Sequence, residues 1–261
     1  MYAVHYKRQV LLSFFPIERL RETHFLECLL LDVYLVPIYT KYMKSIGSSV
    51  SSPSDRRSRK RLATRQDISD AATRLFFERG FDHVTVDEIA AAADVGRMTV
   101  FNHFPRKEDM FFDRDEAVRE VLQNALQQRD PHLAPIETLR LLAHRLVAEH
   151  SRYVEFSEAS QGFIKTIEAS EILKARARAI RDEIAQAVTV GLSESVGREP
   201  TDPDAHLAAG QLVAMWTVAL VLAHQKFRQS RDADEAKAIF LAIVDKGTIG
   251  LKASMAGTPY T

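Results

Sequence analysis

The sequence predicts an all-α protein with a three-helix unit near the N-terminus and a bundle of longer helices after it. Apolar residues recur at helical spacing over most of the chain, and capping residues, glycines and prolines separate the segments. No alternation of β-branched residues lasts long enough to make a sheet. A hydrophobic fraction of 46% with ten glycines fits a globular helical chain. These observations together predict the fold class.

The three-helix unit lies within residues 65–110. The first helix carries one apolar face, made of Ile68, Ala71, Ala72, Leu75 and Phe76, and Gly80 ends it. Thr85 with Glu88 three residues later forms a capping-box pattern, which opens a second helix from Val86 to about Ala92. Residues 93–96 form a turn, and a third helix follows from Arg97 to Phe104. Two short helices joined by a turn of this length are typical of a helix-turn-helix.

This stretch resembles the TetR family of transcriptional regulators. The match runs without a gap through Ala71-Ala72, Leu75-Phe76, Glu78-x-Gly80-Phe81, Thr85-Val86-x-x-Ile89-Ala90, Ala93-x-Val95, Thr99-Val100-Phe101-x-His103-Phe104 and Lys107-Glu108. Two positions depart from the family pattern. Gly96 stands where the family usually has Ser or Thr as the helix cap, and Phe101 stands where it usually has Tyr. The phenol hydroxyl that would bond a phosphate is therefore absent.

The resemblance implies that the third helix enters the DNA major groove. Arg97 can fork onto guanine, Asn102 can pair with adenine, and Met98 or Thr99 can contact a thymine methyl. His103 and Lys107 match positions that contact phosphate in the family. The competing interpretation is that these are ordinary exposed helix residues. The predicted DNA contacts are Arg56, Arg57, Arg59, Arg61, Thr64, Thr85, Gly96, Arg97, Met98, Thr99, Phe101, Asn102, His103 and Lys107.

A local basic cluster precedes the helix-turn-helix. The whole chain has 35 basic and 35 acidic side chains, so a global positive field is excluded and any DNA binding needs a local source. Arg56, Arg57, Arg59, Lys60, Arg61 and Arg65 provide one, against Asp55 alone. This arm is expected either to follow the DNA backbone or enter the minor groove, or to be a solvated tail.

Residues 1–54 differ in character from the rest of the chain. They are aromatic and apolar, and they end in a Ser/Gly/Pro linker from Ser45 to Ser54. Three interpretations of residues 1–42 stay open: sequence upstream of the true start at Met43, an accessory helical segment, or a membrane-associating segment. The run 25–39 contains charges and Pro37, and it is shorter than the roughly 20 apolar residues of a membrane span. We expect 1–54 to be a disordered extension and linker or a mis-assigned start.

Six helical segments are predicted in the remainder of the chain. They run from Lys107 to about Gln128, from Pro135 through His150 and Tyr153, from Glu158 to about Glu168, from the cap Ser170 to about Ser195, and from Asp202 to about Gln229. A last helix runs from Asp232 to about Lys252. Residues 207–223 contain no charge, which indicates a helix buried on every side, with a membrane span as the weaker alternative.

The last two helices resemble the pair with which the family forms a four-helix dimer interface. The predicted interface residues are Leu212, Trp216, Leu220, Ala236, Ile239, Phe240, Ile243 and Gly247. An effector pocket is likewise implied by the family, with polar residues set among apolar ones. Its predicted residues are His150, Phe156, Gln161, Phe163, Gln211, Trp216 and Thr217, each of which has a satisfied core side chain as its alternative.

Other classes of function find no support in the sequence. Cys28 is the only cysteine, which excludes an intramolecular disulfide and fits a cytoplasmic location. No Cys/His spacing indicates a zinc site, and no catalytic triad, paired carboxylate or phosphate-binding loop is visible. We expect neither a metal nor another cofactor, and we do not expect the protein to be an enzyme.

The sequence thus predicts a ligand-responsive, homodimeric DNA-binding regulator of transcription. We expect a repressor that a small molecule releases from a palindromic operator. Its domains would be the extension 1–54, the helix-turn-helix domain with its basic arm at 55–110, and an effector-binding and dimerisation domain at 111–261. The alternative is a helical interaction protein that binds nucleic acid only non-specifically, through its basic arm. The effector, the operator and any choice between repression and activation lie beyond these patterns.

Overall fold

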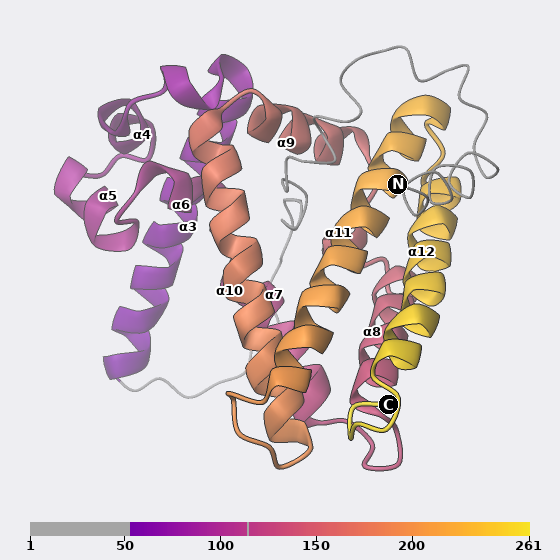
Figure 1. Ribbon diagram of the computed structural model, residues 1–261. Helices are drawn as coiled ribbons and strands as arrows, with labels where there is room; N and C mark the ends of the chain where they lie inside the picture. Colours follow the sequence, from indigo (N-terminus) through magenta and orange to yellow (C-terminus); the bar gives the residue numbers. More distant parts are fainter. Residues whose placement is uncertain (1–52, 114) are drawn as a thin grey trace, which may run out of the picture. The chain divides into compact units, whose positions relative to one another are not determined.

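The computed structural model describes residues 53–113 and 115–261, and all regular structure in them is helical. The interpretations of residues 1–42 therefore lie outside the described residues. Figure 1 shows the order of the elements. They are α3 (Pro53–Arg79), η2 (Phe81–His83), α4 (Val86–Ala92), α5 (Arg97–His103), α6 (Lys107–Phe111), α7 (Asp115–Gln127), α8 (Pro135–Ala148), η3 (Arg152–Val154), α9 (Glu158–Glu168), α10 (Glu171–Ser195), α11 (Pro203–Ser230) and α12 (Ala233–Ser254).

The helix-turn-helix forms where the sequence predicts it. Thr85 caps α4, and its hydroxyl and the Glu88 carboxylate form both bonds of the capping box. Asp94 has a φ of 52° in the turn before α5, a left-handed conformation that Asp tolerates better than most residues. Side chains from all three helices fill one core, because their apolar faces have no other cover. That core contains Ile68, Phe76, Ile89, Val100 and Phe104, each fully buried.

The basic run is part of α3 and forms no separate arm. Helix α3 begins at Pro53, 15 residues before the first core residue, Ile68. Residues 54–79 contain neither Gly nor Pro, and Arg, Lys and Ala are good helix formers. The first helix of the domain is thus much longer than its apolar face. The alternative of an unstructured tail is wrong for residues 53–65, and contact of their basic side chains with the DNA backbone or the minor groove stays a prediction.

The segment predicted as one helix from Lys107 to about Gln128 is broken into α6 and α7. Met110, Phe111 and Phe112 are all buried although they are consecutive. Successive residues on a helix point about 100° apart, so one helix face cannot bury all three. Phe111 stacks on Phe163 of α9 at 4.4 Å between ring centroids, and Phe112 meets the same ring edge-on at 6.0 Å. The break lets both rings pack on α9.

Helix α8 also ends earlier than expected, at Ala148. His150 has a φ of 51° and is exposed, and Tyr153 lies in the separate short helix η3. A left-handed residue ends a helix because the next N–H groups can then return to its last turn. Ser151 N accordingly donates to Leu146 O at 2.8 Å. The expected continuous face through His150 and Tyr153 is therefore wrong.

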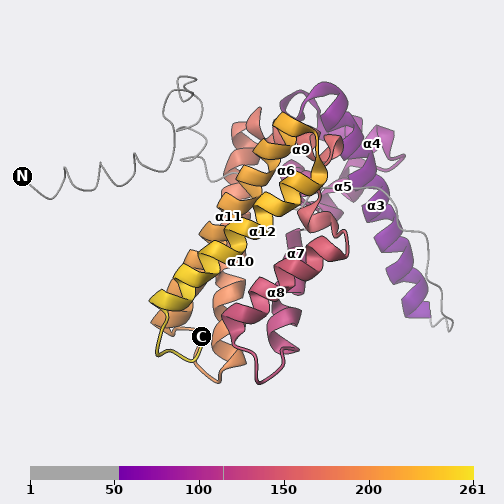
Figure 2. The same cartoon turned by 90° about the vertical axis from the view of Figure 1, so that its right-hand side faces the viewer.

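The three long C-terminal helices begin where the capping residues indicate. Ser170, Asp202 and Asp232 cap α10, α11 and α12 with their side chains. Helices α11 and α12 lie side by side in Figures 1 and 2, with α10 and α8 against them. Gly247 permits the close approach of α11 and α12, because a Cβ there would clash with the Met215 side chain. This packing is the core of the C-terminal bundle.

Helix α11 is long and apolar enough, by length and composition, to cross a membrane, and it is the one such helix in the described part of the chain. Its apolar side chains are nevertheless used inside the protein. Leu212, Val213 and Phe227 are buried where α11 packs between α10 and α12. The core helix of a folded domain needs the same composition, so packing explains the buried part of the run 207–223. Leu207 and Val218 in the same run are exposed, and packing within the chain does not account for them.

Candidate nucleic-acid interface and effector site

Helix α5 presents three polar or flexible side chains to solvent and keeps its apolar side inward. Val100 is fully buried, whereas Arg97, Met98 and Asn102 are exposed. Met98 is 70% exposed, which is unusual for a large apolar side chain and leaves it free to contact a thymine methyl. The geometry of α5 therefore exposes three of the four predicted base-contact residues, and the fourth, Thr99, is half-buried.

Arg97 already has a partner on the preceding helix. Its Nη1 lies 2.7 Å from Asp87 Oδ2, and its guanidinium lies 5.5 Å from the centre of the Phe101 ring. Both members of the ion pair are more than half exposed, so the pair is weak and can open at small cost. Asp87 was not among the predicted site residues, and its sequence position gave no signal that it would face Arg97.

Thr85 uses its hydroxyl within the domain. The hydroxyl accepts from Glu88 N and donates to Glu88 Oε2 at 2.8 Å, and Arg79 Nη2 donates to Glu88 Oε1 at 2.7 Å. The backbone bond from Thr85, followed by the bond from Arg79, lowers the pKa of Glu88 to about 2. Glu88 is thus charged throughout the physiological range. If Thr85 contacts DNA through its hydroxyl, that hydroxyl also has to keep its bonds to Glu88.

Lys107 connects the end of the helix-turn-helix to η2. Its Nζ donates to Phe81 O at 2.9 Å and Val84 O at 3.0 Å, and it lies 4.1 Å from the centre of the Phe81 ring. Burial lowers the pKa of Lys107, and the nearby Asp82 and Glu108 partly offset this shift. An ammonium has three donors, so one remains for a phosphate. The predicted phosphate contact stays a prediction, and the structure adds a second, internal role.

His103 lies where α3 and α5 meet. Arg65 Nη1 donates to His103 O at 2.5 Å, and the Arg65 guanidinium covers the Phe104 ring at 4.0 Å. Burial, and then the positive charges of Arg61 and Arg65, lower the pKa of His103. The imidazole is therefore neutral at pH 7, and it would meet a phosphate as a hydrogen-bond donor. Arg65 was counted in the basic cluster but not as a site residue.

The remaining predicted DNA contacts follow α3 and the N-cap of α5. The basic side chains of α3 are exposed, Thr64 is half-buried, and Gly96 caps α5 without a side-chain bond. Phe101 is half-buried beneath Arg97. The exposed basic residues of this stretch are Arg56, Arg57, Arg59, Lys60 and Arg61. They form a positive extension of the helix-turn-helix along one helix.

The sequence comparisons agree with this geometry. Residues 68–113 match the sequence model described as bacterial regulatory proteins, tetR family. The uncharacterized HTH-type transcriptional regulator YhgD of Bacillus subtilis is 26% identical over 189 residues, which cover 69% of this chain and 94% of that protein. These matches identify residues 68–113 as a TetR-family sequence.

A second relative matches over a shorter stretch of the chain. The HTH-type transcriptional regulator TcmR of Streptomyces glaucescens is 34% identical over 83 residues, which are 32% of this chain and 37% of that protein. Among solved structures, a putative TetR-family regulator from Mesorhizobium loti is similar at 20% identity, covering 75% of this chain and 98% of that one, with a TM-score of 0.48. NalD of Pseudomonas aeruginosa is similar at 22% identity over 72% and 97%, with a TM-score of 0.47.

The C-terminal domain of the chain holds a polar cluster around the buried His224. Gln161 Nε2 lies 3.2 Å from His224 Nδ1, and the His224 ring meets Phe156 edge-on at 4.8 Å. Burial, followed by the charge of Arg228, lowers the pKa of His224 to about 3, so the ring is neutral. Phe240 connects this cluster to Trp216, whose ring centre lies 5.9 Å away. The structure thus places two predicted effector residues, Phe156 and Gln161, against His224, and Phe240 links Phe156 to a third, Trp216, which lies about two turns away from His224 on α11.

Trp216 contains a buried donor without a partner. Its Nε1 has no hydrogen-bond acceptor among the described residues. A buried N–H left unpaired costs about 1–3 kcal/mol, so a bound acceptor at this atom would be favourable. Sequence reasoning singled out Trp216 but offered no sign of the unpaired donor, because pairing depends on the side chains that surround it.

Four other predicted effector residues lie apart from this cluster. His150 is exposed in the turn after α8, so it cannot line an internal pocket, and this expectation is corrected. Gln211 accepts a bond from Ser254 at the surface. Phe163 packs on Phe111 and Phe112, and Thr217 donates to Val213 O within its own helix. Gln211, Phe163 and Thr217 thus each have a contact within the fold.

The predicted dimer residues are mostly buried within the chain itself. Leu212, Trp216, Leu220, Ala236 and Phe240 are in the bundle core, so they cannot contact a second copy directly. Ile239, Ile243 and Gly247 are half-buried. The sequence predicted the two helices but not how each is rotated about its own axis. In the structure, the packing of α11 on α12 turns the faces that carry the predicted interface residues inward. The outward lines of the same two helices carry Leu207, Gly210, Ala214 and Val218 on α11 and Ala238, Ala242, Ile249 and Gly250 on α12.

Proposed function

We propose that this regulator is a cytoplasmic repressor that binds a palindromic operator as a homodimer and is released by a small molecule. The observation that carries the proposal is the outward face of α5, on which Arg97, Met98 and Asn102 are exposed beside the basic turns of α3. An exposed helix of this kind fits the major groove, and a positive helix beside it supplies the attraction to phosphate.

Dimer formation would follow from the exposed apolar lines of α11 and α12. Leu207 is 51% exposed and Ile249 is 72% exposed, although both are large apolar side chains. Small residues beside them, Gly210, Ala214, Ala242 and Gly250, permit close approach of a second copy. Because a palindromic operator has two-fold symmetry, a two-fold protein places one α5 in each half-site.

The effector would bind at the cluster around His224. The cluster offers an aromatic wall, a neutral imidazole and the Gln161 amide, and the unpaired Trp216 N–H lies beyond Phe240 on the same side of α11. A ligand with an acceptor group for Trp216 suits these groups. If it binds better when the two DNA-binding domains have a spacing that no longer matches successive major grooves, it releases the operator by a population shift.

A fluorescence-anisotropy titration with a palindrome from the protein's own promoter tests the DNA-binding part. In excess competitor DNA, Arg97→Ala and Thr99→Ala should each weaken binding by about 1–3 kcal/mol, because each loses a base contact. Arg145→Ala, an exposed arginine on α8, is the control and should leave the affinity unchanged. If competitor abolishes all binding, or if neither α5 variant differs from the parent, the chain binds DNA non-specifically through its basic residues and the proposal is wrong.

A further inference from the structure

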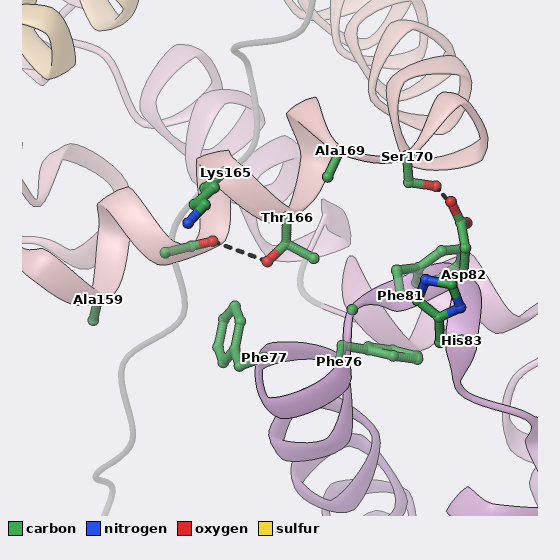
Figure 3. A pocket seen from close by; sticks show the side chains of 12 residues that line it. Phe76, Phe77, Phe81, Asp82, His83, Ala159, Lys165, Thr166, Ala169 and Ser170 are labelled. Atoms are coloured by element: carbon green, nitrogen blue, oxygen red, sulfur yellow. Dashed lines mark hydrogen bonds between the residues drawn. The ribbon is translucent and has the colours of Figure 1, made fainter.

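A pocket of about 640 Å³ lies between the helix-turn-helix domain and α9 (Figure 3). The end of α3 and the turn at η2 form one wall, and the outer face of α9 forms the other. None of its lining residues belongs to the His224 cluster or to the outward face of α5. The volume is in the range of pockets that bind small organic molecules.

Aromatic and small residues make most of the pocket apolar. Phe76 and Phe81 are buried behind the wall, and Phe77 is 44% exposed at it. One edge of the Phe77 ring is supported by Phe111, at 6.3 Å between centroids, and Figure 3 shows the ring facing the α9 side. Across from it, a Cβ added to Gly162 would meet no atom within 4 Å. An open space therefore separates an exposed aromatic ring from a helix surface that has no side chain there.

The two ends of the pocket differ in charge. Lys165 projects from α9 at one end, and its ammonium forms no ion pair with the described residues. At the other end the Asp82 carboxylate accepts a bond from Ser170 Oγ at 2.8 Å, so one of its oxygens is already used. Between them Thr166 donates its hydroxyl to Gly162 O at 2.9 Å and keeps acceptor capacity. The positive charge of Lys165 therefore lies at the end of the pocket near the exposed ring, and the negative charge of Asp82 lies at the opposite end.

We propose that this pocket binds a planar aromatic carboxylate. The ring of the ligand would lie between Phe77 and α9 at Gly162, and its carboxylate would face the Lys165 ammonium. Stacking on Phe77 and burial of the ligand ring supply the apolar part of the affinity, while Lys165 selects the charge. Such a ligand contacts both the DNA-binding domain and α9, so it favours the arrangement of the two that the structure shows.

Binding can be measured without DNA, so this proposal stands or fails independently of the proposed operator binding. The probe is 2-naphthoate, titrated into the full chain by calorimetry, with 2-naphthamide as the uncharged analogue of the same shape. We expect 2-naphthoate to bind about threefold or more tightly than the amide, because an exposed ion pair adds modestly to affinity. Lys165→Gln should abolish this difference and leave amide binding unchanged, whereas Lys246→Gln, an exposed lysine on α12, should preserve it.

A second pair of variants tests the location. Gly162→Leu fills the open space and should weaken both probes about tenfold or more, whereas Gly162→Ala removes the glycine but leaves most of the space. Both variants should fold, since replacing an unhindered helical glycine favours the helix, and circular dichroism melts check this. The proposal is overturned if the amide binds as well as the acid, if 2-naphthylamine binds better than either, or if binding is insensitive to Lys165→Gln and Gly162→Leu.

Discussion

The side chains proposed to contact DNA already have partners within the helix-turn-helix domain. Arg97 is held by Asp87 in a weak, exposed ion pair, so Asp87 restrains the side chain that we propose reads a base. Lys107 and Arg65 serve the domain first, since their donors bind backbone carbonyls of η2, of Val84 and of α5. The residues that we propose bind DNA therefore also hold the shape of the helix-turn-helix.

This competition predicts that Asp87→Asn strengthens operator binding. The substitution removes a carboxylate close to the phosphates and frees Arg97, so the affinity should rise by about threefold at low salt. Asp94→Asn removes a charge from the same motif without touching an arginine partner, and Asn tolerates its left-handed conformation. Anisotropy titrations should show the larger gain for Asp87→Asn. Weaker binding by this variant would mean that the ion pair orients Arg97 for DNA.

His224 predicts how stability depends on pH. Its pKa is about 3 in the folded chain, mainly through burial, against about 6.5 when unfolded. Protonation therefore favours the unfolded state, and the stability that this group contributes is complete above about pH 6.5 and falls as the pH drops toward 3. The loss is at most about 1.4 kcal/mol per pH unit.

Melting temperatures between pH 7 and pH 4.5 check this effect. The parent should lose more stability over that range than His224→Gln, which cannot be protonated. Parallel melting curves for the two proteins would show that His224 is not buried as a neutral ring.

At the scale of elements, the C-terminal residues join two helix starts. Tyr260 is fully buried, its hydroxyl donates to the α11 cap Asp202 at 2.8 Å, and its carbonyl accepts from Ile136 N of α8 at 3.2 Å. Burial and the Asp202 carboxylate raise the pKa of Tyr260, so it stays a donor. The last residues thus act as part of the bundle core.

Tyr260→Ala should accordingly destabilise the C-terminal domain by about 3–5 kcal/mol, the usual cost of removing a buried aromatic ring. Tyr260→Phe keeps the ring and loses only the bond to Asp202, so about 1 kcal/mol is expected. Urea unfolding curves measure both. Equal losses for the two variants would show that the hydroxyl bond, and not ring packing, holds this segment.

At the scale of the whole molecule, the exposed lines of α11 and α12 predict the dimer. Val218 is 42% exposed and Ile249 is 72% exposed. Val218→Asp and Ile249→Asp should each place an unpaired carboxylate in the interface and yield monomers at micromolar concentration. Leu220→Asp would not test this, because Leu220 is buried in the chain's own core and its substitution should unfold the domain.

Sedimentation velocity measures the outcome. Leu141→Asp on α8 and Ile172→Asp on α10 introduce the same charge at other exposed apolar positions and should remain dimers. The predicted face is wrong if all four variants have the same oligomeric state.

Local sequence signals determined the elements of this protein. Capping residues at Thr85, Ser170 and Asp202 and the apolar periodicity around Ile68 set where most helices begin, because these signals act within a few residues. The same local pattern identified the helix-turn-helix and its outward side chains. Family membership could be inferred from it for that reason.

Tertiary packing decided what lies between and against those helices. The break after Phe111 exists because both neighbouring rings pack on Phe163, and no local pattern requires it. The rotation of α11 on α12 turned Trp216 and Phe240 inward and left Val218 and Ile249 outward. Burial of His224, the pairing of Arg97 with Asp87 and the pocket at Phe77 likewise depend on residues distant in the sequence. Such contacts are set by how complete helices pack, which helical periodicity alone does not specify.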